Sequence, residues 1–286
     1  MPAPELRPTS SAFSDSIYSD TVARLRAAGC VFAEDEAQLL LAGAANPAEL
    51  LEFIERRTSG YPLEHILGWS EFCGLRIALD PGVFVPRRRT ELLVNEAAAL
   101  LRSNRPGDGG APPPVVVDLC CGSGAVGAAL ADRVDGIELH AADIDPAAVE
   151  CALRNVGLAG GLVHEGDLYQ ALPPRLKGRV RLLAVNAPYV PTEAISMMPH
   201  EAREHESRIA LDGGSDGLAF HRRVAAGAPA WLASRGHLLI ETSERQAART
   251  AAIMAAAGFD VRTVRSEELD GTAVVGQAPG AQKSAD

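Results

Sequence analysis

The tetrapeptide Asn186-Ala187-Pro188-Tyr189 has the residue types needed for chemistry on a planar, amide-like nitrogen. It follows an apolar run that predicts a strand at 182–185, so it should lie at a strand end. An amide nitrogen is a weak nucleophile because its lone pair is delocalised into the carbonyl. The Asn186 side-chain oxygen and the Ala187 carbonyl could hold its two N–H groups and stabilise positive charge growing on nitrogen. Tyr189 could pack on the flat group. Taken alone, the motif fits an ordinary turn equally well.

A glycine-rich segment, Gly122-Ser123-Gly124-Ala125-Val126-Gly127, is a second candidate site. It lies between a predicted strand and a predicted helix, and its glycines allow a tight turn and a close approach of ligand to backbone. Asp143 follows Gly124 at roughly the 20-residue spacing typical of an acid that accepts hydrogen bonds from a ribose. The pattern is typical of both dinucleotide and S-adenosylmethionine sites.

Two further acids favour S-adenosylmethionine. Asp118 ends the strand before the glycine turn, where a carboxylate would repel a pyrophosphate and attract a cationic ligand. S-adenosylmethionine carries an ammonium and a sulfonium group. Asp167, after a predicted strand at 162–164, could accept a hydrogen bond from an adenine amino group. Each acid alone could cap a helix or a turn, but acids at three successive strand ends predict a cofactor site.

The elements that would position these residues alternate between strand and helix, which predicts an α/β fold with an open, mostly parallel sheet. Ligands bind such sheets beyond the carboxyl ends of the strands. Strands are predicted at 115–119, 137–142, 162–164, 182–185, 236–240, 259–264 and 273–276, and helices at 124–133, 146–156, 218–233 and 244–258.

The preceding residues are predicted to be mostly helical, with helices at 34–43 and 90–102 and a short strand at 71–79. A further helix should begin at Asn46, because an Asn cap is followed by proline in the first turn. The segment 103–114 is rich in Gly, Pro and polar residues and is the predicted linker.

Composition narrows the function classes. The 286 residues carry a net charge of −10, which argues against extensive nucleic-acid binding. No apolar stretch is long enough to span a membrane, and no export signal is recognised, so a cytoplasmic location is expected. Five scattered cysteines predict free thiols rather than a metal or disulfide framework. His200 and His205 are five residues apart, which does not place them on one helix face, so no metal site is predicted.

Several motifs together resemble the HemK/PrmC family of protein glutamine N5-methyltransferases over nearly the whole chain. The segments that carry the resemblance are Tyr61–Gly68, Val85–Arg87 with Thr90-Glu91, Asp118-Leu119 with Gly122–Gly124, Asp143, Asn186-x-Pro188-Tyr189, Ala210–Leu218 and Val274–Gly276. The sequence departs from the family at two places. Ala187 replaces the first proline of Asn-Pro-Pro-Tyr, and Cys120-Cys121 replaces the usual Gly-Thr.

The resemblance implies a class I methyltransferase fold with a seven-stranded sheet, and a small N-terminal helical domain followed by a β-hairpin. The expected organisation is a disordered lead-in at 1–20, a substrate-recognition domain at 21–102, the linker, a methyltransferase domain at 115–278 and a tail at 279–286. The substrate implied is the glutamine of a Gly-Gly-Gln motif in a peptide-chain release factor.

The resemblance also assigns roles to residues. The catalytic residues are Asn186, Pro188 and Tyr189, while Ala187, Arg87 and Glu91 are expected to join them in substrate binding. The residues expected at S-adenosylmethionine are Asp118, Gly122, Gly124, Asp143, Asp167 and Asn186. Two alternatives remain open: a small-molecule or nucleic-acid N-methyltransferase on the same fold, and a weakly active cofactor-binding scaffold. The protein is expected to be a monomer.

Overall fold

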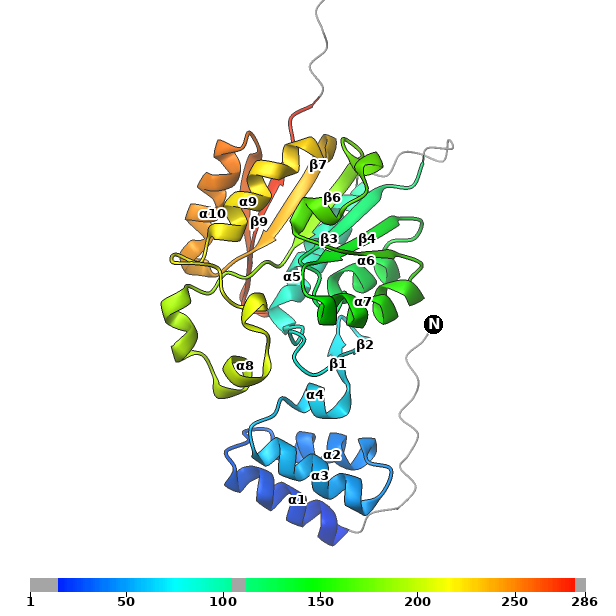
Figure 1. Ribbon diagram of the computed structural model, residues 1–286, viewed down its shortest axis with the longest axis vertical. Helices are drawn as coiled ribbons and strands as arrows, with labels where there is room; N and C mark the ends of the chain where they lie inside the picture. The colour runs from blue at the N-terminus through cyan, green and yellow to red at the C-terminus, as the bar shows by residue number, and fades with distance from the viewer. Residues whose placement is uncertain (1–14, 104–111, 281–286) are drawn as a thin grey trace, which may run out of the picture.

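The N-terminal part of the molecule is a small helical unit, shown at the bottom of Figure 1. The computed structural model describes residues 15–103 and 112–280. The unit consists of α1 (Asp15–Ala27), α2 (Ala33–Gly43), α3 (Pro47–Thr58) and the short α4 (Leu63–Leu67). Apolar side chains from all four helices, among them Leu25, Leu40 and Ile54, form its core.

The start of α3 is confirmed in detail, whereas the start of α1 was missed. The Asn46 side chain accepts hydrogen bonds from the N–H groups of Ala48 and Glu49. In contrast, α1 begins at Asp15, inside the lead-in predicted for 1–20. This helix has no strong capping signal, and it is stabilised by packing its apolar side chains on α2 and α3. Residues 1–14 lie outside the described part.

The single strand predicted at 71–79 is a hairpin, which agrees with the implication of the family resemblance. β1 (Trp69–Phe72) pairs antiparallel with β2 (Leu75–Ala78). Cys73 and Gly74 form the turn with φ values of 54° and 77°. Two such residues in succession reverse the chain, so the alternating pattern belongs to two strands rather than one. The short η1 (Arg88–Thr90) and then α5 (Glu91–Ser103) follow.

The second unit is built on one seven-stranded sheet, as predicted. Its strands, in spatial order, are β5 (Leu162–Glu165), β4 (Glu138–Asp143), β3 (Val115–Leu119), β6 (Val180–Val185), β7 (Leu232–Glu241), β9 (Gly271–Gln277) and β8 (Asp260–Ser266). The first five are parallel, and β9 runs antiparallel between β7 and β8. The strand order reverses at β3, so chains leave β3 and β4 towards a shared crevice.

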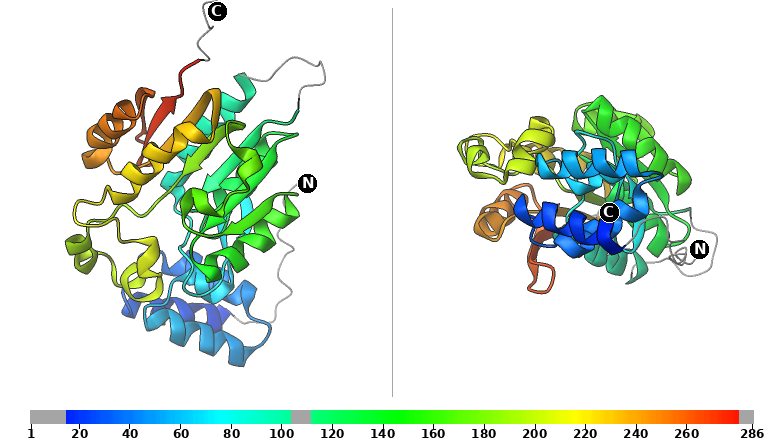
Figure 2. Two further views of the ribbon diagram at one scale, coloured as in Figure 1. Left: turned by 45° about the horizontal axis from the view of Figure 1, so that its top comes forward. Right: turned by 90° about the horizontal axis from the view of Figure 1, so that it is seen from below.

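Helices cover both faces of the sheet (Figures 1 and 2). α5, α6 (Ala125–Arg133) and α7 (Pro146–Leu158) contribute to the core on one face. The core on the other face is shared with α9 (Ala219–Gly227), α10 (Glu244–Ala256) and the short helical turns η2 (Leu168–Ala171), η3 (Pro174–Leu176) and η6 (Ala228–Ala230).

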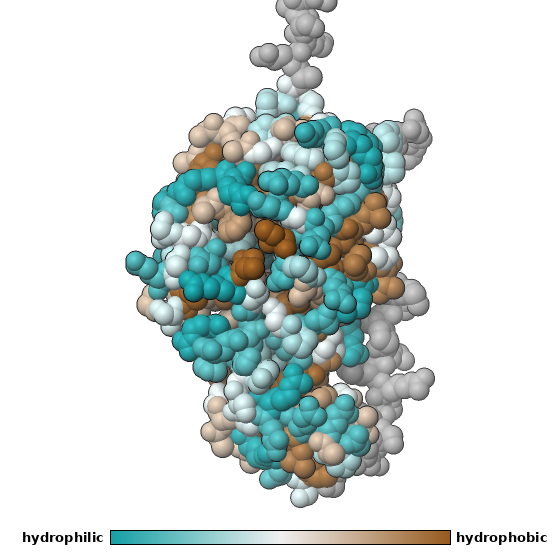
Figure 3. Space-filling view, viewed as in Figure 1, coloured by the Kyte–Doolittle hydropathy of each residue, from teal (hydrophilic) through white to brown (hydrophobic). Residues whose placement is uncertain are grey.

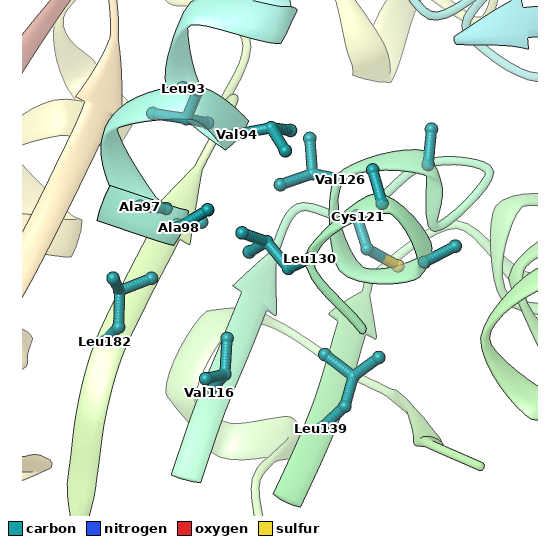
Figure 4. Packing of buried hydrophobic residues seen from close by; sticks show 14 of the residues in the cluster. Leu93, Val94, Ala97, Ala98, Val116, Cys121, Val126, Leu130, Leu139 and Leu182 are labelled. Carbon is teal, nitrogen blue, oxygen red and sulfur yellow. The ribbon is translucent and has the colours of Figure 1, made fainter. Parts of the chain in front are cut away.

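α5 belongs to the core of the sheet although it precedes the predicted linker at 103–114. Figure 4 shows Leu93 and Val94 of this helix facing the sheet residues Val116 and Leu182. By packing, therefore, the helical unit ends before α5, and residues 21–102 do not form one unit. Residues 104–111 of the linker and 281–286 of the tail lie outside the described part.

Two segments differ from the predicted elements. The helix predicted at 218–233 is shorter, because the chain enters η6 at Ala228 and β7 already begins at Leu232, which pairs with Val180. The segment 191–217, here called the flap, contains η4 (Thr192–Met197), α8 (His200–His205) and η5 (Arg208–Ala210). Among the described residues, no helix combines the length and apolarity that crossing a bilayer requires.

Candidate active site

A pocket lies at the carboxyl ends of β3, β4 and β6 and extends between the flap and residues 82–90. Figure 3 shows hydrophobic residues near the middle of one face of the molecule, surrounded by hydrophilic ones. The apolar side chains that line the pocket are Phe72, Val83, Phe84, Val126, Ile144, Leu168, Met198, Ile209, Leu211 and Phe220. The polar groups lie at the strand ends, as the sequence pattern predicts.

Asp143 ends β4 and is held in a fixed orientation at the glycine turn. Its Oδ2 accepts a hydrogen bond from Gly122 N–H at 2.8 Å, and its Oδ1 accepts one from Asp145 N–H at 3.0 Å. Gly122 has a φ of 54°, a conformation that favours glycine. Burial raises the pKa of Asp143, although these backbone hydrogen bonds favour its ionised form. Each oxygen retains a lone pair for a hydroxyl donor.

Asp118 is almost completely buried at the end of β3 and also lines the pocket. Its Oδ2 accepts a hydrogen bond from Gly127 N–H at 2.8 Å. Burial raises the pKa of Asp118 to about 7, and the nearby Asp143 adds to the shift. A side chain at Gly127 would crowd the carboxylate, since an added Cβ would lie 3.3 Å from Asp118 Oδ2. The carboxylate is thus poised to be stabilised by a cationic ligand.

Gly124 does not line the pocket, although it was expected at the cofactor. It caps α6 with a φ of 76°. A Cβ at this position would come within 2.6 Å of Val156 Cγ2 on α7 and within 3.2 Å of Ala152. Gly124 is therefore required for the close packing of α6 on α7, whereas the adjacent Gly122 and Ser123 face the pocket.

Asp167 is at the opposite end of the cofactor region. It lines the pocket and forms an ion pair with Arg223 at 2.5 Å, so it is partly neutralised in the absence of a ligand. Ile144 and Leu168 lie beside the acids, and Ile144 is about half exposed. An exposed apolar side chain directly after Asp143 suits the face of a planar ring. The sequence offered Ile144 as a signal only through its position.

The tetrapeptide after β6 lies at the same pocket, with all four residues in its wall. Asn186 Nδ2 donates a hydrogen bond to Thr90 Oγ1 at 3.3 Å. In the described part of the chain, no group donates to Asn186 Oδ1 or to the Ala187 carbonyl. Both oxygens thus remain available as acceptors.

Tyr189 is held at two points. Its hydroxyl donates to Glu241 Oε1 at 3.3 Å, and its carbonyl accepts from Gln246 Nε2 at 3.0 Å. Burial raises the pKa of Tyr189, and the carboxylate of Glu241 raises it further, so the phenol stays neutral. The ring is therefore a fixed wall of the pocket rather than a proton acceptor.

The two residues predicted near the mouth have different positions. Arg87 lines the pocket and forms an ion pair with the buried Glu206 of the flap. Glu91 is not in the lining, and its Oε1 accepts a hydrogen bond from Cys73 N–H at 3.4 Å, which ties α5 to the hairpin turn. The geometry therefore gives Glu91 a structural contact instead of the expected substrate contact.

The histidines of the flap are not arranged around a metal. His205 stacks on Tyr61, with ring centroids 4.0 Å apart, and His200 meets His205 edge-on. Across residues 15–103 and 112–280, no group of three potential metal ligands converges. The prediction that the two histidines do not share a metal-binding helix face agrees with this arrangement.

Sequence reasoning missed Arg89 and Glu241 and identified Thr90 only as part of a motif. Glu241 ends β7 and is buried beside the end of β6, next to Arg89 and Thr90 of η1. Because parallel strands end at one sheet edge, an acid at the end of β7 was a detectable signal. Its partners come from a segment about 150 residues earlier in the chain, at 88–90, and only the tertiary structure brings them together.

The fold and this site can be compared with known proteins. Residues 74–202 match the family model described as the methyltransferase small domain. The chain is 36% identical over 219 residues to the release factor glutamine methyltransferase of Geobacter sulfurreducens, covering 75% of this chain and 73% of that relative. It is 35% identical over 246 residues to the 4-amino-L-phenylalanine/4-methylamino-L-phenylalanine methyltransferase of Streptomyces pristinaespiralis, covering 86% and 82%.

Among solved structures, the chain is similar to the release factor-specific protein-(glutamine-N5) methyltransferase of Alicyclobacillus acidocaldarius. The two are 25% identical with a TM-score of 0.41, and the match covers 68% of this chain and 94% of that one. The predicted class I methyltransferase fold and the predicted enzyme class are both confirmed. On its sequence similarity, its sheet and its strand-end motifs, the chain belongs to the HemK/PrmC family of protein glutamine methyltransferases.

Proposed function

We propose that this methyltransferase methylates the side-chain amide nitrogen of a glutamine in a peptide-chain release factor, with S-adenosylmethionine as methyl donor. One observation carries the proposal. Asn186 is anchored through Nδ2, so its Oδ1 and the neighbouring Ala187 carbonyl are two free acceptors in one pocket wall. A primary carboxamide has two N–H donors that match them.

The donor set at the other end of the pocket fits the cofactor. Asp118, Asp143 and Asp167 offer carboxylates to a ligand with cationic groups, ribose hydroxyls and an adenine amino group. A dinucleotide pyrophosphate would be repelled by the same acids. S-adenosylmethionine, when bound, supplies an electrophilic methyl group. The apolar walls formed by Ile144 and Leu168 suit the adenine ring.

The chain's own residues then act on the acceptor nitrogen. Asn186 Oδ1 and the Ala187 carbonyl would hold both N–H groups and thereby orient the lone pair. The same oxygens would stabilise the positive charge that develops on nitrogen. Tyr189 would confine the flat amide, and holding the reactants in line is itself a large effect. No general base is needed for bond formation, because the proton can leave afterwards to water.

A protein substrate agrees with the surroundings of the pocket. The mouth lies between the flap and residues 82–90, beyond which the helical unit is positioned to contact a partner (Figure 1). A Gly-Gly-Gln tip is narrow, because glycines carry no side chains. The relatives' names include release factor glutamine methyltransferases from several bacteria. The role implies a cytoplasmic enzyme, and we expect it to work as a monomer without extensive nucleic-acid contact.

One observation favours a second candidate, an N-methyltransferase of small aromatic amines. The relative from Streptomyces pristinaespiralis is named for such a reaction, and its alignment covers more of this chain than the Geobacter alignment does. Ala187, in place of a proline, leaves a smaller side chain at the pocket. An aromatic primary amine also presents two N–H groups to the same acceptors.

Mass spectrometry separates the two functions. The enzyme is incubated with S-adenosylmethionine and either the release factors of its organism or 4-amino-L-phenylalanine. A gain of about 14 Da on the Gly-Gly-Gln glutamine, absent with Asn186→Ala, is the expected result. Methylation of the amine with an unmodified release factor would contradict the proposal and establish the second candidate.

A further inference from the structure

The buried carboxylate at the end of β7 offers a function that the motifs do not assign. Glu241 has only 2% of its surface exposed, and it does not line the pocket. Its Oε1 accepts from the Tyr189 hydroxyl and lies 3.6 Å from Arg89 Nε. Its Oε2 is buried and, in the described part of the protein, has no hydrogen-bond partner at ordinary distance. A buried carboxylate of this kind attracts any donor nearby.

That donor is the Thr90 hydroxyl, which hydrogen-bonds with Glu241 and favours its ionised form. The same hydroxyl oxygen is the acceptor for Asn186 Nδ2 at 3.3 Å. Thr90 is itself buried, with 3% exposed, so water cannot easily replace either partner. A chain of polar contacts thus runs from Glu241 through Thr90 to Asn186, the residue expected to hold the acceptor amide.

The direction of this chain follows from the chemistry of its members. A hydroxyl can donate or accept, and an amide side chain has a donor end and an acceptor end. An ionised carboxylate can only accept. Once Thr90 gives its proton to Glu241, its oxygen is left to accept, and it can receive a hydrogen bond only from the Nδ2 end of Asn186. The Oδ1 end must then face the pocket.

We infer that Glu241 and Thr90 are positioning residues that fix the orientation of the Asn186 amide, so that its oxygen faces the acceptor nitrogen. Without this constraint the amide could rotate and present its NH₂ group, which would repel an N–H donor and destabilise positive charge on the substrate. The inference rests on the proposed function of Asn186, which it extends to two residues that contact neither substrate nor cofactor. Arg89 assists by keeping Glu241 ionised.

The first test compares turnover with cofactor affinity. Glu241→Gln keeps the shape but adds a donor, and Thr90→Val keeps the shape but removes the hydroxyl. Both variants should lower kcat by about 10–100-fold, less than the loss of Asn186 itself. The Kd for S-adenosylmethionine should stay within about 2-fold of the wild-type value, because this network does not contact the cofactor region. Thr90→Ser, which restores the hydroxyl, should recover kcat to within about 3-fold.

A matched control separates orientation from a general loss of a buried hydroxyl. Thr250 is fully buried in α10, where its hydroxyl contacts His221 and Thr242. Thr250→Val should leave kcat within about 2-fold of wild type, since it removes a hydroxyl of the same kind without touching Asn186. An equal loss of kcat in this control would overturn the inference.

The second test does not depend on the acceptor. In protein labelled with ¹⁵N in asparagine, the Asn186 side-chain signal is identified by its loss in Asn186→Ala. Thr90→Val and Glu241→Gln should shift this signal and accelerate its exchange with water, whereas Thr250→Val should not. If wild type fails to methylate a release factor, the proposed function fails while this measurement still tests the network. An unmoved Asn186 signal, or cofactor affinity falling together with kcat, would overturn the inference.

Discussion

Single side chains at the strand ends divide the work of the pocket between cofactor and acceptor. Asp143 is oriented by two backbone N–H groups and is expected to accept hydrogen bonds from the ribose hydroxyls. Hydrogen bonds to a charged group contribute about 1.5–3 kcal/mol. Asp143→Ala should therefore weaken S-adenosylmethionine binding at least about tenfold in calorimetry. Unchanged affinity, or tight binding of NAD by the wild type, would contradict the assignment.

The buried carboxylate of Asp118 gives cofactor binding a pH dependence. Its pKa is raised to about 7, so it is largely protonated at pH 6 and ionised at pH 8. A cationic ligand requires the ionised form, and affinity should rise between these values by at most about tenfold per pH unit. Asp118→Asn should flatten the profile. Calorimetry at both pH values checks this, and a wild-type profile that stays flat would argue against ionic contact with Asp118.

The same shift affects the stability of the ligand-free protein with a defined sign. The folded state holds the Asp118 proton more tightly than the unfolded state, whose pKa is near 3.8. The contribution of Asp118 to the free energy of unfolding therefore falls as pH rises from about 4 to about 7. Binding of a cation to the ionised carboxylate would offset this loss.

Asn186 should act on the acceptor and not on the cofactor, although its place in the pocket also allowed a cofactor contact. Asn186→Ala should reduce kcat by around 10²–10³, as the loss of one preorganised transition-state partner does. Cofactor affinity should barely change. Ala187→Pro is the matched control, because only the backbone carbonyl is used there, and it should be nearly silent. A parallel fall of binding and turnover would give Asn186 a different role.

Among the elements, α5 matters because it completes the core of the sheet from a position before the linker. Leu93 on this helix is 1% exposed and packs in the core shown in Figure 4. Leu93→Ala should lower the free energy of unfolding by about 2–5 kcal/mol, through lost burial and a residual cavity. Leu51→Ala, on the half-exposed surface of α3, should cost less than about 0.5 kcal/mol. Urea unfolding distinguishes them, and a small effect at Leu93 would assign α5 to the helical unit.

The flap is the element that connects the two units. Arg57 of α3 forms ion pairs with Glu36 of α2 and with Glu201 of α8 at 2.5 Å each. Arg57 is mostly buried, whereas Glu201 is about half exposed. The pair with Glu36 therefore anchors Arg57 within the helical unit, and the pair with Glu201 is the more easily broken contact. The flap also meets the sheet unit through Arg87 and Glu206.

For the whole molecule, the pocket and the helical unit should respond to different ligands. All three cofactor acids belong to the sheet unit, while α1–α3 have a separate core. Saturating S-adenosylmethionine stabilises what it contacts, by about 2.7 kcal/mol at a concentration 100 times its Kd. Hydrogen exchange should slow at the β3–α6 and β4–α7 turns and stay unchanged in α1–α3. Asp143→Ala is the control, and slowed exchange in α1–α3 would contradict independent units.

The sequence by itself determined the sheet and the residues at its strand ends. The run Val115–Leu119 is buried along its whole length, as its apolar character required. Asp118, Asp143 and Asn186 reach one pocket because the carboxyl ends of parallel strands share one edge, and that follows from topology alone. The glycines at 122 and 124 were also identified, but their two roles, ligand approach and helix packing, could not be separated without knowing what lies opposite each.

Only the tertiary structure decided which distant segments serve the site. The assignment of α5 to the sheet core depends on packing, and an amphipathic helix does not specify which apolar face it will cover. Glu91 and Thr90 are adjacent in one motif, yet the direction of each side chain sends one to the hairpin and the other to Asn186. The Glu241 contacts likewise join β7 to a turn far earlier in the chain. Such contacts arise from burial and hydrogen-bond satisfaction in three dimensions, which no local pattern records.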